Sequence, residues 1–194
     1  MTMPQSSAAR TVLDSAYRCF CRTGFHRTTI REIAQEARLS RQSVYKHVGC
    51  KRGALVKLTE STLGAALAAA EQESRSASTP AEKAQRILDV KLGVAFRLWA
   101  DSPAHAQELR SAARAAAPEV FDAYDRDMAG LLTTALDELV PGASGEVAGI
   151  LLTFARGLEI DPRDASAARL QLRTGVHLIT AGALTSEQTP DPFS

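Results

Sequence analysis

Residues 28–51 read TTIREIAQEARLSRQSVYKHVGCK, and this stretch decides the fold of the N-terminal part of the chain. Thr29 and Glu32 form a T-x-x-E capping box, which predicts that a helix begins here. Apolar residues then recur at helical spacing, at Ile30, Ile33, Ala34 and Ala37. The pattern predicts a short amphipathic helix that ends near Ala37.

A second short helix is predicted after a tight turn at Arg38-Leu39. Ser40 is a good N-cap for a helix over about residues 41–47. Val44 and Val48 are four residues apart, so we expect both to point inward. The side chains left on the outer face are mostly hydrogen-bond donors: Arg41, Gln42, Ser43, Lys46 and His47.

Two short helices joined by a tight turn, the second rich in donors, are typical of a helix-turn-helix motif that binds double-stranded DNA. Arg and Gln near the start of the second helix can read base edges in the major groove. Tyr45, Lys46 and Lys51 suit phosphate oxygens. The alternative is that these polar residues form an ordinary solvated helix face.

The charge distribution favours the DNA-binding interpretation. Ten of the 23 basic residues but only three of the 22 acidic ones lie in residues 1–56, a net charge of +7. The remainder of the chain therefore carries −6, although the total is only +1. A basic end attracts the phosphate backbone, and an acidic body is repelled by it.

Residues 8–55 resemble the DNA-binding domain of tetracycline-repressor (TetR) family transcriptional regulators. The resemblance rests on VLDSAYRCF, Gly24-Phe25, TTIREIA, SVYKHV and the K-x-x-L that follows, and it covers roughly a quarter of the chain. It implies that Arg31, Gln42 and Arg41 contact bases. It also implies that the DNA backbone is contacted by Thr28, Thr29, Tyr45, His47 and Lys51.

Two positions depart from the family pattern. Arg38 stands in the turn where the family usually has Gly, and a side chain at positive φ costs about 1 kcal/mol. Either the turn has another geometry, or the arginine is useful near DNA. Cys50 stands where Ser usually caps the next helix, which leaves a redox or metal-sensing role open beside an ordinary substitution.

The composition is that of a globular protein of one or two domains. Hydrophobic residues make up 45% of the chain, and no run of them is long enough to span a membrane. The N-terminal MTMPQSSAAR has no apolar stretch, so we expect no secretion signal and a cytoplasmic location. Three cysteines fit a reducing compartment. Cys19 and Cys21 are two residues apart on one predicted helix and so point to different sides, which is poor geometry for a disulfide or a shared metal.

The rest of the chain predicts an all-α fold of about nine helices. Helices are expected at about residues 8–23 and 51–75, the second being a connector to the C-terminal part. Later helix starts are marked by Thr79-Pro80, Ser102-Pro103, Ala117-Pro118 and Asp161-Pro162, and a stop is marked by Val140-Pro141-Gly142. We expect a DNA-binding domain over residues 1–50, a ligand-binding and dimerisation domain over 51–194, and a frayed tail from Thr185.

The middle of the C-terminal part holds large side chains with polar ones between them. A cavity for a small apolar or aromatic effector could be lined by Phe96, Trp99, His105, Arg110, Phe121, Tyr124 and Met128. The alternative is that each of these residues belongs to the ordinary core. The family resemblance implies such a cavity but does not choose its residues.

The last two predicted helices are apolar and interrupted by small residues, which favours close helix packing. The family resemblance implies a homodimer through a four-helix bundle. The candidate interface residues are Ile150, Leu151, Phe154, Leu158, Leu172, Val176, Ile179 and Ala183. The alternative is packing within one chain only.

No catalytic motif, metal-ligand spacing or phosphate loop is present, so we expect neither an enzyme nor a cofactor or metal. The resemblance implies a homodimeric regulator that binds a palindromic operator, most often as a repressor released by a small molecule. The rival is an all-α small-molecule-binding protein or enzyme whose basic end is incidental.

Overall fold

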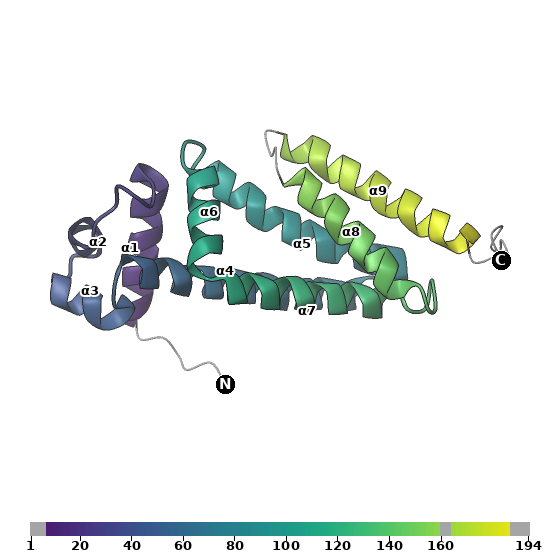
Figure 1. Cartoon of the computed structure of the whole chain (residues 1–194), viewed down its shortest axis with the longest axis horizontal. Coiled ribbons are helices and arrows are strands. Elements are labelled where there is room, and N and C mark those ends of the chain that lie inside the picture. The colour runs from purple at the N-terminus through teal and green to yellow at the C-terminus, as the bar shows by residue number, and fades with distance from the viewer. Residues whose placement is uncertain (1–6, 160–163, 187–194) are drawn as a thin grey trace. The chain divides into compact units, whose positions relative to one another are not determined.

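The computed structural model describes residues 7–159 and 164–186, and these residues form nine α-helices and no strand (Figure 1). The helices are α1 Ser7–Thr23, α2 Ile30–Ala37, α3 Arg41–Val48, α4 Lys51–Ser76, α5 Pro80–Asp101, α6 Ala106–Ala116, α7 Pro118–Leu136, α8 Ser144–Leu158 and α9 Ala165–Ser186. The predicted all-α fold is confirmed. No helix in the described part is both long enough and apolar enough to cross a membrane.

The chain folds into two compact units that alternate along the sequence. The first unit takes the described residues of Met1–Leu63 together with Leu98–Asp122, and the second takes those of Gly64–Arg97 and Ala123–Ser194. Helix α6, although it is distant in sequence, therefore belongs to the same unit as α1, α2 and α3. The division of function at residue 50 stays a prediction, since compactness groups residues by packing and not by role.

Local hydrogen bonds explain why most helices begin where the sequence predicts. At the start of α2, the Glu32 N–H donates to Thr29 Oγ1 (3.2 Å) and the Thr29 N–H donates to Glu32 Oε2 (2.7 Å), so the capping box is formed. Ser40 Oγ accepts from the Ser43 N–H at 3.1 Å and caps α3. Thr79 caps α5 in the same way, with Pro80 as its first residue.

Ser102-Pro103 and Asp161-Pro162 are predicted helix starts with different outcomes. Ser102-Pro103 does not open a helix, because the Ser102 hydroxyl donates to the Cys21 carbonyl (2.9 Å) and α6 begins only at Ala106. The predicted start at Asp161-Pro162 lies outside the described residues. In the described part, the Asp164 carboxylate accepts from the N–H groups of Ser166 and Ala167, both at 2.9 Å, and so caps α9.

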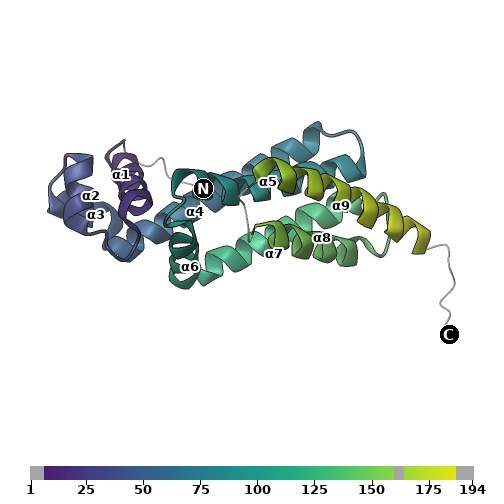
Figure 2. The same ribbon diagram turned by 90° about the horizontal axis from the view of Figure 1, so that it is seen from above.

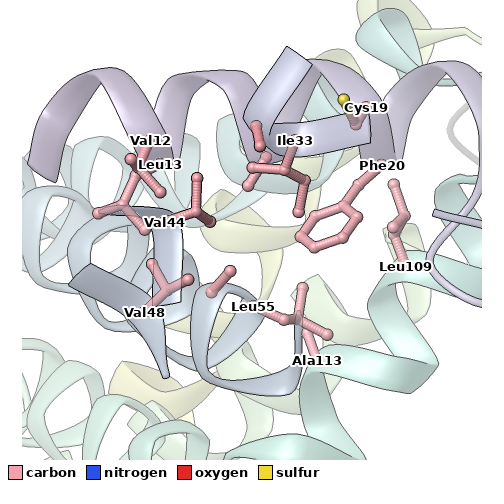
Figure 3. Packing of buried hydrophobic residues seen from close by; sticks show 13 residues of the cluster. Val12, Leu13, Cys19, Phe20, Ile33, Val44, Val48, Leu55, Leu109 and Ala113 are labelled. Carbon is pink, nitrogen blue, oxygen red and sulfur yellow. The ribbon is translucent and has the colours of Figure 1, made fainter. Parts of the chain in front are cut away.

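The core of the first unit is built around Phe20 of α1. Phe20 belongs to one cluster with side chains from α2, α3, α4 and α6, and Figure 3 shows Leu109 and Ala113 of α6 near its ring. Burying a side chain of this size contributes about 2–3 kcal/mol. Because α6 supplies part of this core, the position of the helix-turn-helix depends on a segment far along the chain.

The second unit has its own core, in which α8 and α9 lie side by side (Figures 1 and 2). Its fully buried side chains include Leu88, Leu92, Met128, Leu132, Leu151 and Leu172. The Phe154 ring of α8 occupies the space that a Cβ at Gly175 of α9 would need. Glycine at this position therefore lets the two helices pack closely within one chain.

Candidate nucleic-acid interface

Helix α3 has one buried and one exposed face, as the sequence predicts. Val44 and Val48 are 0% and 4% exposed and lie in the core of the first unit. On the opposite side Tyr45 is 51% exposed, although large aromatic side chains are usually buried. Exposed polar residues surround it at Arg41, Gln42 and Lys46. The outer edge of α3 is therefore open to a partner.

The residues predicted to contact DNA fall into three groups by exposure. Six are exposed and lie on α2, on α3 or at the N-cap of α2: Thr29, Arg31, Arg41, Gln42, Tyr45 and Lys46. Three are half-buried: Ser43, His47 and Lys51. Thr28 is buried. The structure thus brings six of these residues onto the surface of two consecutive helices. The other four have partners or burial that change what they can do.

Thr28 lies inside the first unit with 1% of its surface exposed. Its hydroxyl donates to the Gly24 carbonyl at 2.6 Å and is 2.9 Å from Thr23 Oγ1. Gly24 has a φ of +81°, a conformation that favours glycine. Thr28 therefore closes the connection between α1 and α2 and does not face outward.

The Lys51 side chain also has hydrogen-bond partners within the first unit. Its ammonium donates to the carbonyls of Phe25 (2.8 Å) and His26 (2.9 Å) and lies 4.7 Å from the centre of the Phe25 ring. An ammonium has three donors, so one remains for a phosphate oxygen. The main role of Lys51 is therefore to hold the α1–α2 connection, which the sequence spacing did not indicate.

The basic residues of this region divide into used and unused cations. Arg18 and Arg22 pair with Glu36 at 2.9 and 3.2 Å, and Arg52 donates to the Ala116 carbonyl at 3.2 Å. Six exposed cations show no hydrogen bond or ion pair to the described residues: Arg10, Arg27, Arg31, Arg38, Arg41 and Lys46. Four of these six lie in α2, α3 and the turn between them.

Both carboxylates of α2 already have partners. The Thr29 hydroxyl and N–H bind Glu32, and the guanidinium groups of Arg18 and Arg22 bind Glu36; these contacts hold the pKa of both carboxyls below its usual range. From residue 37 to residue 59 the chain has six Lys or Arg and no Asp or Glu. The surface formed by α3 is therefore positively charged, as DNA phosphates require.

The α2–α3 turn has the left-handed geometry for which glycine is best suited. Arg38 has φ 55° and ψ 40°, and its N–H donates to the Gln35 carbonyl at 3.1 Å. The Leu39 N–H donates to the Ala34 carbonyl at 3.0 Å, which lets Leu39 pack on the core. The sequence left two explanations open for Arg38 in this turn. The explanation that the turn has another geometry is wrong, because Arg38 adopts the left-handed conformation.

Cys50 caps α4 despite being a poor acceptor. Its sulfur accepts from the Gly53 N–H at 3.3 Å, and the thiol is exposed. A Cβ at Gly53 would collide with the Val48 carbonyl oxygen, so this glycine allows α3 and α4 to meet at a tight corner. The described residues contain no cluster of His, Cys, Asp and Glu that could hold a metal ion.

The predicted effector-binding residues do not fall in one unit. Trp99, His105, Arg110 and Phe121 belong to the first unit and are half-buried, whereas Phe96, Tyr124 and Met128 are buried in the second. The second unit also has a groove of about 550 Å³ between α4, α5 and α7, but none of the seven residues lines it. The structure therefore gathers only three of them within a single core.

A buried ionic cluster beside Tyr124 was missed by sequence reasoning. Lys91 is 7% exposed, and its ammonium lies 3.2 Å from Glu159, 3.7 Å from Asp125 and 5.4 Å from the centre of the Tyr124 ring. Burial, with the nearby Glu159 and Asp125, raises the pKa of Tyr124, whose hydroxyl has no hydrogen-bond partner among the described residues. A lysine within the apolar stripe of α5 was the available signal.

The predicted dimer residues are divided between the core and the surface. Leu151, Leu172 and Val176 are at most 2% exposed and pack inside the second unit, so they cannot meet another chain. Ile150 is exposed, and Phe154, Leu158, Ile179 and Ala183 are half-buried. Sequence reasoning missed the other large apolar side chains that are exposed on α9, which are Leu170, Leu178 and Leu184.

Residues 12–53 match the model of a family described as bacterial regulatory proteins, tetR family. Among curated proteins, none matches the sequence. Solved structures share the fold across both units. The fatty acid degradation regulator FadR from Bacillus halodurans is 18% identical with a TM-score of 0.68, covering 94% of this chain and 98% of that chain.

Two further structures are similar. A regulatory protein in the tetR family from Rhodococcus RHA1 is 19% identical with a TM-score of 0.65, covering 91% of this chain and 97% of that chain. The transcriptional regulator FadR from Bacillus subtilis, in complex with stearoyl-CoA, is 16% identical with a TM-score of 0.66, covering 89% and 98%. The helix-turn-helix part of the chain, residues 12–53, thus matches the tetR family of bacterial regulatory proteins, and the whole fold is similar to that of solved regulators.

Proposed function

We propose that the chain is a ligand-responsive transcriptional repressor that inserts the outer edge of α3 into the major groove of an operator. The observation that carries this proposal is the composition of that edge. Arg41, Gln42, Tyr45 and Lys46 are exposed on a helix whose other face is buried, in a stretch of chain without a single acidic residue. A solvated face without a DNA partner has no need of this uncompensated charge.

The exposed residues suit different parts of the duplex. Gln42 and Arg41, in the first turn of α3, can form bidentate hydrogen bonds to base edges, and Arg31 of α2 extends this set. Thr29, Ser43, Tyr45, Lys46 and His47 suit phosphate and sugar oxygens, which set the position of the helix without reading sequence. Lys51 supports the region mainly from within.

The exposed apolar side chains of α8 and α9 support a homodimer. Ile150, Leu170, Leu178 and Leu184 are each at least 40% exposed, and Gly149, Gly157 and Gly182 have open space around them. A second copy of the same surface would bury these residues about a two-fold axis. Two heads would then contact half-sites about 34–36 Å apart on a palindromic operator.

The interior of the second unit supports an effector site. Phe96 and Met128 are buried there, and the Tyr124 hydroxyl has no partner among the described residues. An apolar effector with one hydrogen-bonding group would suit the apolar side chains and supply a partner for the Tyr124 hydroxyl. Among the structural neighbours, one is the fatty acid degradation regulator FadR and another is a FadR in complex with stearoyl-CoA. Release from DNA would follow if the effector bound the non-binding conformation more tightly.

The function is tested by selecting duplexes from a randomised pool with the purified protein. We expect a palindromic site to be enriched and its retardation in gels to weaken steeply as salt rises. Changing Gln42 to Ala should reduce discrimination against single base-pair changes by about 1–3 kcal/mol at one position. Changing Lys46 to Ala should weaken binding to all duplexes alike.

The control is Arg126→Ala, which removes an exposed cation of α7, outside the helix-turn-helix. It should change neither the DNA affinity nor the discrimination between base pairs. Absence of any enriched sequence, together with no retardation at low salt, would contradict the proposal. That result would favour a cytoplasmic ligand-binding protein with an incidental basic end. Family members of this kind are regulators, and we propose no enzyme activity and no cofactor.

A further inference from the structure

Arg38 occupies a backbone conformation that disfavours its own side chain. It is the sole residue other than glycine with positive φ among the described residues, at φ 55° and ψ 40°. The turn needs this conformation, because it directs the Leu39 N–H to the Ala34 carbonyl and the Leu39 side chain to the core. Glycine would adopt the same turn without steric conflict.

The side chain of Arg38 has no structural use that offsets this conflict. It is exposed, and it forms no hydrogen bond, ion pair or ring contact with the described residues. The two acids of α2 have other partners: Glu32 binds Thr29, and Glu36 binds Arg18 and Arg22. Strained residues that the fold does not require are commonly kept at functional sites.

The position of Arg38 indicates what that use is. It lies two residues before Ser40, the N-cap of α3, and three before Arg41, in the acid-free stretch of residues 37–59. It therefore extends the row of unpaired cations of α3 onto the turn that precedes it. A guanidinium offers five donors in a fixed plane and binds phosphate oxygens in pairs.

We propose that Arg38 binds a DNA backbone phosphate beside the groove that α3 enters. This inference rests on the proposed function. It assigns a phosphate contact to the turn itself, in addition to those of the two helices. Because the contact reaches backbone and not bases, it adds affinity for every sequence and no discrimination between sequences.

The test compares R38G, R38N and R38K with the parent protein. Both R38G and R38N relieve the backbone conflict and remove the charge, whereas R38K keeps the conflict and the charge. Binding is measured on a duplex enriched by the parent from a randomised pool and on an unrelated duplex of the same length. Thermal unfolding of each variant is measured on the full chain, with R126A as the control for loss of an exposed cation.

We expect R38G to unfold at the same temperature as the parent or about 2–4 °C higher. Its affinity should fall about tenfold on both duplexes at moderate salt. The slope of log K against log salt should shrink by about 0.9 for each phosphate that is no longer neutralised, or about 2 for a two-headed complex. R38K should keep the slope of the parent and most of its affinity.

Equal affinity and equal slope for R38G and the parent would overturn the inference. So would a fall in affinity for R38K as large as that for R38G, since the charge would then not be the cause. If R38G proves less stable, R38N replaces it in the comparison, and the same outcomes apply. Failure of the parent itself to bind either duplex would be a failure of the proposed function, which these variants do not measure.

Discussion

Thr28 shows how one hydroxyl can be assigned to the fold or to DNA by a single experiment. The structure places it inside the first unit, donating to the Gly24 carbonyl at 2.6 Å. Thr28→Val keeps the branched shape and removes that donor, so we expect stability to fall by about 1–2 kcal/mol. Urea unfolding followed by circular dichroism measures the change.

DNA affinity separates the two roles. Because the side chain faces inward, the folded Thr28→Val protein should bind an enriched duplex within about twofold of the parent, a far smaller effect than removal of a phosphate-binding group would have. Thr29→Val, at the exposed neighbouring position, is the matched comparison. A valine variant at residue 28 with unchanged stability and weakened DNA binding would restore the phosphate contact predicted from sequence.

At this scale the sequence predicts which residues lie on each face of α3 but not what the neighbouring loop requires. The burial of Val44 and Val48 follows from helical spacing alone. The carbonyls of Gly24, Phe25 and His26 acquire partners only once the chain has turned between α1 and α2. No local pattern indicates that Thr28 and Lys51 supply the donors.

The capping box of α2 makes the first unit sensitive to acid. Hydrogen bonds from the Thr29 hydroxyl and N–H hold the pKa of Glu32 below its ordinary value of 4.5. Because the folded state favours the ionised carboxylate, Glu32 contributes its full stabilisation above pH 4.5. The contribution is lost as the pH falls through the lowered folded-state pKa.

Glu32→Gln tests this dependence, since glutamine still accepts from the Thr29 N–H but gains no proton. We expect the variant to lose less stability than the parent between about pH 5 and pH 3. Trp99, the sole tryptophan, lies in the first unit and reports unfolding by fluorescence. Parallel curves of stability against pH for the two proteins would show that protonation of Glu32 is not coupled to unfolding. Glu36 is present in both proteins, so its own contribution is the same in the two curves.

Helix positions were largely predictable because caps are local. Thr29, Ser40 and Thr79 each satisfy an N–H three residues ahead, and the sequence shows this directly. Ser102 has the same sequence pattern, but its hydroxyl donates to the carbonyl of Cys21, which is 81 positions earlier. The same distance in sequence hid the packing of α6 on α1, since hydrophobic periodicity marks the apolar face of a helix and not its partner.

At the scale of the whole molecule, the exposed face of α8 and α9 predicts the oligomeric state. Leu178 is 63% exposed, so Leu178→Glu should leave the fold intact but place a charge in the proposed dimer interface. We expect the variant to sediment as a monomer and to lose affinity for a palindromic duplex by at least about tenfold. Gln72→Glu adds the same charge to an exposed position of α4 and is the control.

A dimeric Leu178→Glu protein with parental DNA affinity would place the interface elsewhere. The sequence indicated α8 and α9 as candidate interface helices, but three of the residues it chose, Leu151, Leu172 and Val176, are core residues. Two apolar stripes on one helix cannot be told apart by composition. Which stripe is covered depends on how α8 and α9 rotate against each other, and the contact of Phe154 with Gly175 belongs to that packing.

The contribution of α6 to the core around Phe20 has a consequence for protein synthesis. A ribosome adds roughly 5–20 residues per second, so about 3–10 s separate the emergence of α4 from that of Leu109 and Ala113. During this interval the nascent helix-turn-helix lacks one wall, and the apolar side of α1 is open to chaperones. The core that supports α3 is therefore completed only after α6 has emerged, although α1 to α4 are made before it.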